Sequence, residues 1–168
     1  MAHLPPVRRH YVGRSPEPGG ATEFGHDLAA GISRLGTAWV LGAPTRDFVT
    51  ELRRTLERQR SMLDAQNLDW FTAADQLLHR QMFEFADVGE LWRLVRSRSG
   101  DIDRLRRLHL PASGKAASIL DDHRKIVDAI EAGDPHSADA AMREHLSGTL
   151  SELELICERY PDYVKVHD

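Results

Sequence analysis

Two histidines near the C-terminal end of the sequence stand where hydrophobic side chains are expected. His123 and His145 occur in the segment DDHRKIVDAIEAGDPHSADAAMREHL, on either side of Gly133-Asp134. The apolar residues around each histidine recur every three or four positions, which is the spacing of the buried face of a helix. Because 134 is the midpoint of 123 and 145, an antiparallel helical hairpin would place both imidazoles inward at the same level.

A third histidine and an acid lie four residues apart in the segment ADQLLHRQMFEFA. At this spacing Asp75 and His79 share one face of a helix, next to its apolar face. Three imidazoles and one carboxylate form a ligand set suited to Zn(II), Ni(II), Mn(II) or Fe(II). The pattern therefore predicts a divalent-metal site made by Asp75, His79, His123 and His145. The alternative is a set of buried histidines that are satisfied by ordinary hydrogen bonds.

One arginine also falls on a predicted buried face. Arg98 lies on the apolar face of a predicted helix over residues 90–110, and its distance from the turn near Asp87 places it roughly level with His79 and Asp75. A buried guanidinium needs a partner, and arginine recognises carboxylates with two parallel hydrogen bonds. Arg98 is therefore a candidate ligand-binding residue for a small organic acid. Equally, it could pair with a protein acid or extend to solvent.

Six helices with short connections would position these side chains. The periodicity predicts helices over about 28–41, 45–67, 68–86, 90–110, 113–132 and 135–160. Thr45 and Asp134 are predicted N-caps, Gly133 a C-terminal stop, and Asn67 the end of the second helix. No segment predicts a strand. The expected fold class is all-α, an antiparallel bundle of about six helices.

The first 20 residues differ from the rest in composition. Residues 1–20 are rich in proline and glycine and predict a flexible arm or linker, whereas residues 21–168 predict one helical ligand-binding domain. The basic residues of the arm indicate a solvated tail rather than a contact with nucleic acid. They are Arg8, Arg9, His10 and Arg14.

The composition of the 168 residues excludes several classes of protein. The net charge of -4 argues against electrostatic binding of nucleic acid. Cys157 is the only cysteine, so no internal disulfide can form, and a cytoplasmic location fits best. No apolar run approaches the roughly 20 residues of a membrane span, and the N-terminus lacks the apolar region of a signal peptide.

The two histidine segments together resemble the FCD domain, the effector-binding half of FadR-type regulators of the GntR family. The resemblance rests on an Asp with a His four residues later, then H-x-x-I-x-x-A-I-x-x-G-D, then A-x-x-x-H-L, in this order over roughly residues 22–160. It departs from the family at Leu78, where a phenylalanine is usual, and near Asp87, where an asparagine is usual. Both are packing or turn positions, so the site is expected to survive.

The resemblance implies a function. In the family the residues that match Asp75, His79, His123 and His145 bind a divalent metal, and two open positions take a small organic acid or waters. It also implies a homodimer. Family regulators carry a winged helix before this domain, whereas here the arm precedes it, so this chain alone is expected not to bind DNA specifically.

The sequence thus predicts a metal-dependent organic-acid sensor rather than an enzyme. The alternative is a metal-dependent helical-bundle enzyme acting on a small carboxylate, since a metal with open positions can activate water or oxygen. Against this, the predicted core lacks the Glu-x-x-His pairs of helical di-iron enzymes. A purely structural helical domain is the third possibility.

Overall fold

The computed structural model describes residues 44–98, 103, 107, 110–112 and 114–146, and every regular element among them is a helix. The named elements are α2 (Arg46–Asp64), α3 (Leu68–Phe85), α4 (Gly89–Arg98) and α6 (Lys115–Glu131). A fifth helical segment follows over 135–146. The all-α prediction is therefore confirmed for the described part of the chain. It contains five helices rather than six, because the predicted first helix and the arm lie outside it.

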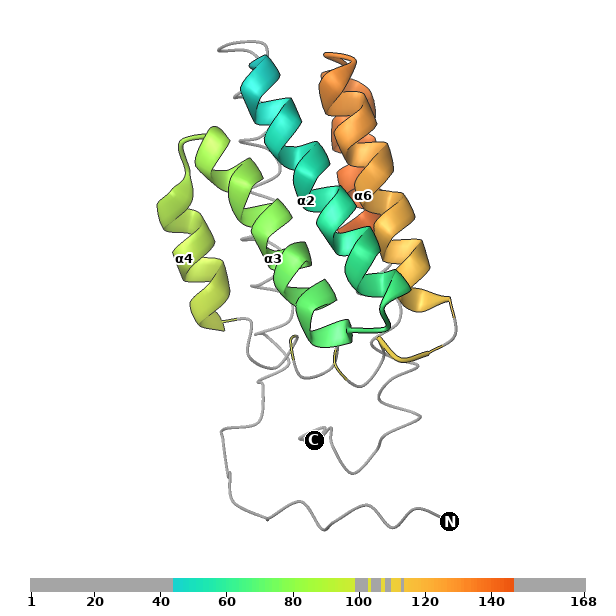
Figure 1. Ribbon diagram of the computed structural model, residues 1–168. Helices are drawn as coiled ribbons and strands as arrows, with labels where there is room; N and C mark the ends of the chain where they lie inside the picture. Colours follow the sequence, from blue (N-terminus) through green and yellow to red (C-terminus); the bar gives the residue numbers. More distant parts are fainter. Residues whose placement is uncertain (1–43, 99–102, 104–106, 108–109, 113, 147–168) are drawn as a thin grey trace, which may run out of the picture.

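The helices lie side by side as a bundle. Figure 1 shows α3 between α4 and α2, with α6 on the other side of α2. Contacts run from α2 to both α3 and α6, and from α3 to α4. No helix within the described ranges combines the length and apolar character needed to cross a membrane.

Side-chain caps set the start of α2 and α3. The backbone N–H of Phe48 donates to Thr45 Oγ1 at 3.2 Å, so Thr45 is the predicted N-cap of α2. The sequence predicts that Asn67 closes α2, but α2 ends at Asp64 and Asn67 instead caps α3 by accepting from the Trp70 N–H at 3.2 Å. The amide side chain explains the difference, because its oxygen can satisfy a free N–H at the start of a helix.

The core is built from the apolar faces of these helices. Phe71 and Leu78 of α3 are buried, whereas Phe85 is only partly buried and stacks on Phe48 with 3.9 Å between ring centroids. Its position in the last turn of α3 explains the exposure. The buried cluster also includes Leu52, Leu56, Met82, Leu120, Ile126, Val127, Ile130, Ala138 and Met142.

The turn between α6 and the 135–146 segment sets the level of the histidines. Gly133 has a φ of 68°, a left-handed conformation that glycine adopts without steric cost. Asp134 Oδ1 then accepts from the backbone N–H groups of His136 and Ser137, both at 3.1 Å. The predicted stop and cap are therefore both confirmed. The predicted extension of the last helix to residue 160 lies outside the described residues.

Candidate metal centre

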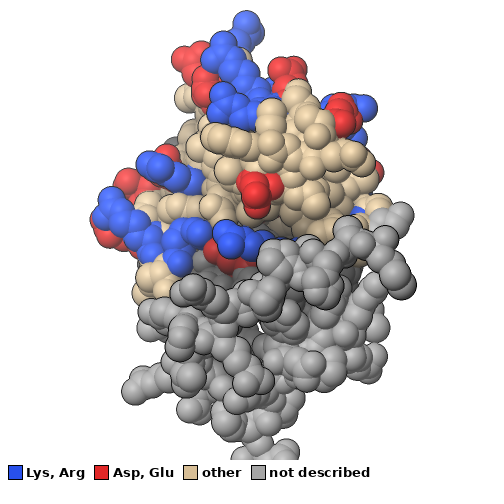
Figure 2. Space-filling view, turned by 60° about the horizontal axis from the view of Figure 1, so that its bottom comes forward, with Lys and Arg blue, Asp and Glu red and all other residues tan. Residues whose placement is uncertain are grey.

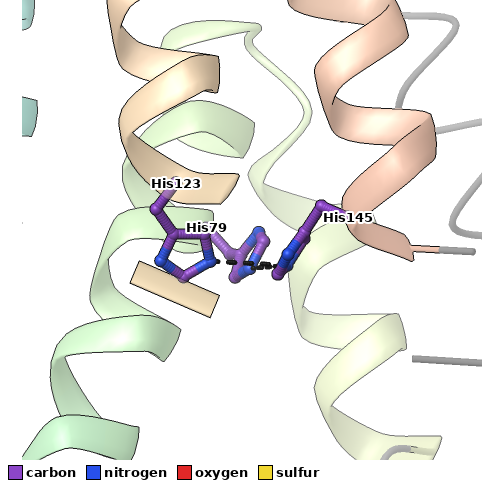
Figure 3. Close-up of side chains that lie close together, drawn as sticks. All are labelled: His79, His123 and His145. Atoms are coloured by element: carbon purple, nitrogen blue, oxygen red, sulfur yellow. Dashed lines mark hydrogen bonds between the residues drawn. The ribbon is translucent and has the colours of Figure 1, made fainter. Parts of the chain in front are cut away.

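Three buried imidazoles meet at the centre of the bundle. His79 comes from α3, His123 from α6 and His145 from the 135–146 segment, and their exposed fractions are 8%, 0% and 3%. Figure 3 shows the three rings pointing toward one another between the helices. His145 Nε2 lies 3.3 Å from Nε2 of His123 and 3.3 Å from Nε2 of His79. The sequence-based expectation that His123 and His145 face each other across the hairpin is confirmed.

Asp75 joins this group from α3. Its side chain is almost fully buried, and its Oδ1 lies 3.5 Å from His123 Nε2 and 4.0 Å from His79 Nε2. The spacing of four residues thus places Asp75 and His79 on the same inward face of α3. The structure brings together the four residues predicted as metal ligands.

The spacing of the nitrogen atoms fits a shared metal ion. Two imidazole nitrogens that each lie about 2.0–2.1 Å from one ion are separated by about 2.8–3.4 Å, for bond angles from 90° to tetrahedral. The two observed separations are 3.3 Å, and the ligand atoms of the three histidines all lie within 4.8 Å of one another. These three histidines could therefore hold a metal ion.

Gln59 of α2 contacts the outer nitrogen of His123. Its side chain is fully buried, and its Oε1 lies 2.8 Å from His123 Nδ1. This contact was not predicted from the sequence. The available signal was the position of Gln59 between Leu56 and Leu63, where the apolar face of α2 calls for a hydrophobic residue.

The outer nitrogen of His145 faces an acid. His145 Nδ1 lies 3.8 Å from Asp122 Oδ2. The ammonium of Lys125 donates to Glu144 at 3.2 Å and to Asp122 at 3.3 Å. These hydrogen bonds, the one to Glu144 first, raise the pKa of Lys125. Lys125 thereby holds the Asp122 carboxylate beside the buried imidazole of His145.

Arg98, the predicted ligand-binding arginine, is the last residue of α4. Its side chain lies outside the described part of the structure, so its proximity to the histidines stays a prediction.

Comparison with known proteins places this site in a family. The FCD domain matches residues 30–148, most of the chain. The chain belongs to the FCD domain family. The FCD assignment predicted from the two histidine segments is confirmed.

Relatives of this FCD domain are transcriptional regulators by name. The chain is 36% identical over 115 residues to an "Uncharacterized HTH-type transcriptional regulator in unstable DNA locus" of Streptomyces ambofaciens, which covers 68% of the chain and 48% of that protein. It is 23% identical over 113 residues to "HTH-type transcriptional repressor RspR" of Escherichia coli (strain K12), covering 67% of the chain and 50% of that protein. The chain spans about half the length of the curated relatives it matches.

Proposed function

We propose that this FCD domain is a metal-dependent sensor of small organic acids in a transcriptional regulator. The observation that carries the proposal is the convergence of three buried imidazole Nε2 atoms with a carboxylate oxygen 3.5 Å from one of them. Asp75, His79, His123 and His145 would hold one divalent ion. The HTH-type regulators among the relatives support the regulatory role and favour a non-enzymatic domain.

The hydrogen-bonding capacity of the imidazoles supports a cation over a purely structural cluster. Nε2 of His145 lies 3.3 Å from two other Nε2 atoms. A ring nitrogen carries either one hydrogen or one lone pair in the plane of the ring, so it serves one linear hydrogen bond well. Only one of these two contacts can be a full hydrogen bond between neutral rings. A cation among the three nitrogens would instead accept a lone pair from each of them.

The charge of the site favours an anionic effector. A divalent ion with three neutral imidazoles and the single carboxylate of Asp75 leaves a formal charge of +1. An anion near this charge gains Coulomb energy, because the site is buried and poorly screened. When bound, the ion would supply the positive centre for a carboxylate, and Arg98 is the proposed second contact. Binding would then shift the helices between two arrangements.

Metal analysis tests the first half of the proposal. The protein is stripped with a chelator, reconstituted with Zn(II), Ni(II), Mn(II) or Fe(II), and titrated. We expect one ion per chain for the wild type and loss of tight binding for His145→Ala. His136→Ala is the matched control, because His136 is an exposed histidine at the start of the same helical segment. Absence of metal uptake at neutral pH, or equal loss of binding in both variants, contradicts the proposal.

A panel of mono- and dicarboxylates tests the second half. A ligand that binds only the folded state at 100 times its Kd stabilises it by about 2.7 kcal/mol, which corresponds to roughly 5–10 °C in Tm. We expect this shift for at least one acid in the metal-loaded protein and none after stripping. Arg98→Ala should reduce the shift while metal content stays unchanged. Equal stabilisation by neutral ligands with the metal removed would disprove acid sensing at this site.

Assembly and DNA binding extend the same proposal. We expect a homodimer, because dimers with two-fold symmetry are the commonest closed oligomers. We also expect no sequence-specific DNA binding by this chain alone, because its net charge is -4. Light scattering across a concentration series and a gel-shift assay at physiological salt measure the two properties. A concentration-independent monomer contradicts the first, and a sequence-specific shift the second.

A further inference from the structure

One buried amide contacts the outer nitrogen of a histidine in the cluster. Gln59 projects from α2, is 0% exposed, and presents its Oε1 to His123 Nδ1 at 2.8 Å. This distance is short enough for a full hydrogen bond, and an amide oxygen can only accept, so the bond requires a hydrogen on His123 Nδ1. This contact is shorter than those of His123 Nε2 to His145 at 3.3 Å and to Asp75 at 3.5 Å.

We propose that Gln59 is a positioning residue that fixes His123 as the Nδ1–H tautomer and so aims a bare Nε2 lone pair at the metal site. The consequence for metal affinity rests on the proposed function, whereas the tautomer itself does not. A hydrogen-bond acceptor at the outer nitrogen of a metal-ligating histidine orients the ring and raises the basicity of the ligating nitrogen.

The tautomer is decided by competition for a single proton. A neutral imidazole has one N–H, so a hydrogen at Nδ1 leaves a lone pair at Nε2. Gln59 Oε1 accepts at Nδ1 over 2.8 Å, whereas His145 Nε2 at 3.3 Å and Asp75 Oδ1 at 3.5 Å compete at Nε2. The shorter contact favours the proton at Nδ1. If Gln59 could not accept, Asp75 would draw the proton to Nε2, where it would block a metal ion.

The amide nitrogen of Gln59 helps to distinguish a positioning role from a purely structural one. Within the described part of the structure, Gln59 Nε2 has no hydrogen-bond partner although it is buried. A buried donor without a partner destabilises the fold. Replacement of Gln59 by an apolar side chain removes this cost while leaving His123 Nδ1 without its acceptor. The two effects oppose each other, so the metal-free fold should change little.

Two variants and one control test the inference. Gln59→Met keeps the unbranched shape without an acceptor, and Gln59→Glu keeps an oxygen at the same place. Thr55→Val is the matched control, because Thr55 is also buried on α2, one turn before Gln59, and its hydroxyl donates to Gln81 Oε1 at 2.9 Å rather than to the cluster. The ¹⁵N shifts of the His123 ring in the metal-free protein report its tautomer. Competition with a chromophoric chelator reports the Zn(II) Kd.

Gln59→Met should change the His123 tautomer and the Zn(II) Kd but have little effect on the Tm. Wild type, Gln59→Glu and Thr55→Val should show His123 as the Nδ1–H tautomer, and Gln59→Met should lose this preference. The Zn(II) Kd should rise about 10- to 100-fold for Gln59→Met alone. The Tm of metal-free Gln59→Met should lie within about 4 °C of wild type.

Each failure points to a different conclusion. An unchanged tautomer and Kd in Gln59→Met overturns the positioning role while the metal proposal stands. The same holds if metal-free wild type carries the proton on His123 Nε2. If wild type binds no divalent metal, the proposed function fails, and the ¹⁵N shifts alone still decide whether Gln59 sets the tautomer.

Discussion

Two polar clusters connect α2 with α6, one buried and one exposed. In the buried cluster Gln59 of α2 contacts His123 of α6, which adjoins Asp75. In the exposed cluster Arg53 of α2 pairs with two acids of α6, Asp128 at 2.6 Å and Glu131. The hydrogen bond to Glu131, followed by that to Asp128, raises the pKa of Arg53. The same pair of helices thus carries two quite different kinds of polar contact.

The difference lies in where the positive charge comes from. The exposed cluster contains its own cation, the Arg53 guanidinium, and water solvates the excess negative charge of the two carboxylates. On the face drawn in Figure 2, Lys and Arg lie next to Asp and Glu at several places on the described surface. The buried cluster brings together imidazole nitrogens and one carboxylate. A cation from solution would complete it, so its stability should depend on metal while that of the exposed cluster should not.

The largest expected effect is loss of metal-dependent stabilisation in His123→Ala. At a free ion concentration 1,000 times its Kd, wild type should gain about 4 kcal/mol, or roughly 8–16 °C in Tm. His123→Ala should gain far less, because one of the three imidazoles that could hold the ion is missing. Thermal unfolding with Zn(II) and with chelator measures both values. An equal gain in the two proteins would refute a site at His123.

The next effect separates two acids that flank the histidines. Asp75→Asn should weaken metal binding by more than the roughly 10- to 100-fold that follows loss of a hydrogen-bond partner of a metal ligand, because it removes the proposed charged ligand. Asp122→Asn is the matched control. Asp122 lies 3.8 Å from the outer nitrogen of His145 and is already bonded to Lys125. If titration shows the reverse ranking, Asp75 is not the ligand.

Much of the fold and site could be predicted from local rules. The levels of His123 and His145 followed from helical periodicity and from a turn whose Gly133 and Asp134 act as stop and cap. Asp75 and His79 followed from a spacing of four. These features depend on residues near in sequence, so the sequence alone was sufficient to predict them.

The contacts between distant helices could not be predicted in the same way. The 2.8 Å contact between Gln59 and His123 joins residues 64 positions apart. It depends on how α2 rotates and slides against α6, which is set by packing of many side chains. The predicted role of Asn67 as the end of α2 was wrong, because an asparagine between two helices can end the first or cap the second, and local sequence does not decide between them.

A smaller effect should come from the exposed cap at Asp134. Hydrogen bonds from the Ser137 side chain and then its backbone N–H lower the pKa of Asp134 below its ordinary value of 3.8. Because the folded pKa is lowered, the carboxylate stabilises the fold above the unfolded pKa and loses this contribution as pH falls through the folded pKa. Metal-free Asp134→Ala should therefore have a lower Tm than wild type at pH 5–7, with a gap that narrows below about pH 4.

Asp134→Asn is the control for that experiment, since asparagine caps helices about as well as aspartate without a charge to titrate. Its Tm difference from Asp134→Ala should persist in acid. A gap between wild type and Asp134→Ala that widens as pH falls would contradict the lowered pKa.

The smallest effect is expected at the exposed cluster itself. Arg53→Ala removes both ion pairs to α6, yet the side chains of Arg53, Asp128 and Glu131 are 36%, 62% and 54% exposed, so water already screens these charges. Exposed ion pairs contribute about 0–1 kcal/mol each, and 1 M salt reduces the Debye length to about 3 Å. Urea unfolding should therefore show a small loss at low salt that shrinks at 1 M NaCl and is the same with Zn(II) or chelator. A loss that grows in the presence of Zn(II) would show that the two clusters are coupled through α6, and the contrast between a self-sufficient surface cluster and a metal-dependent buried one would then be wrong.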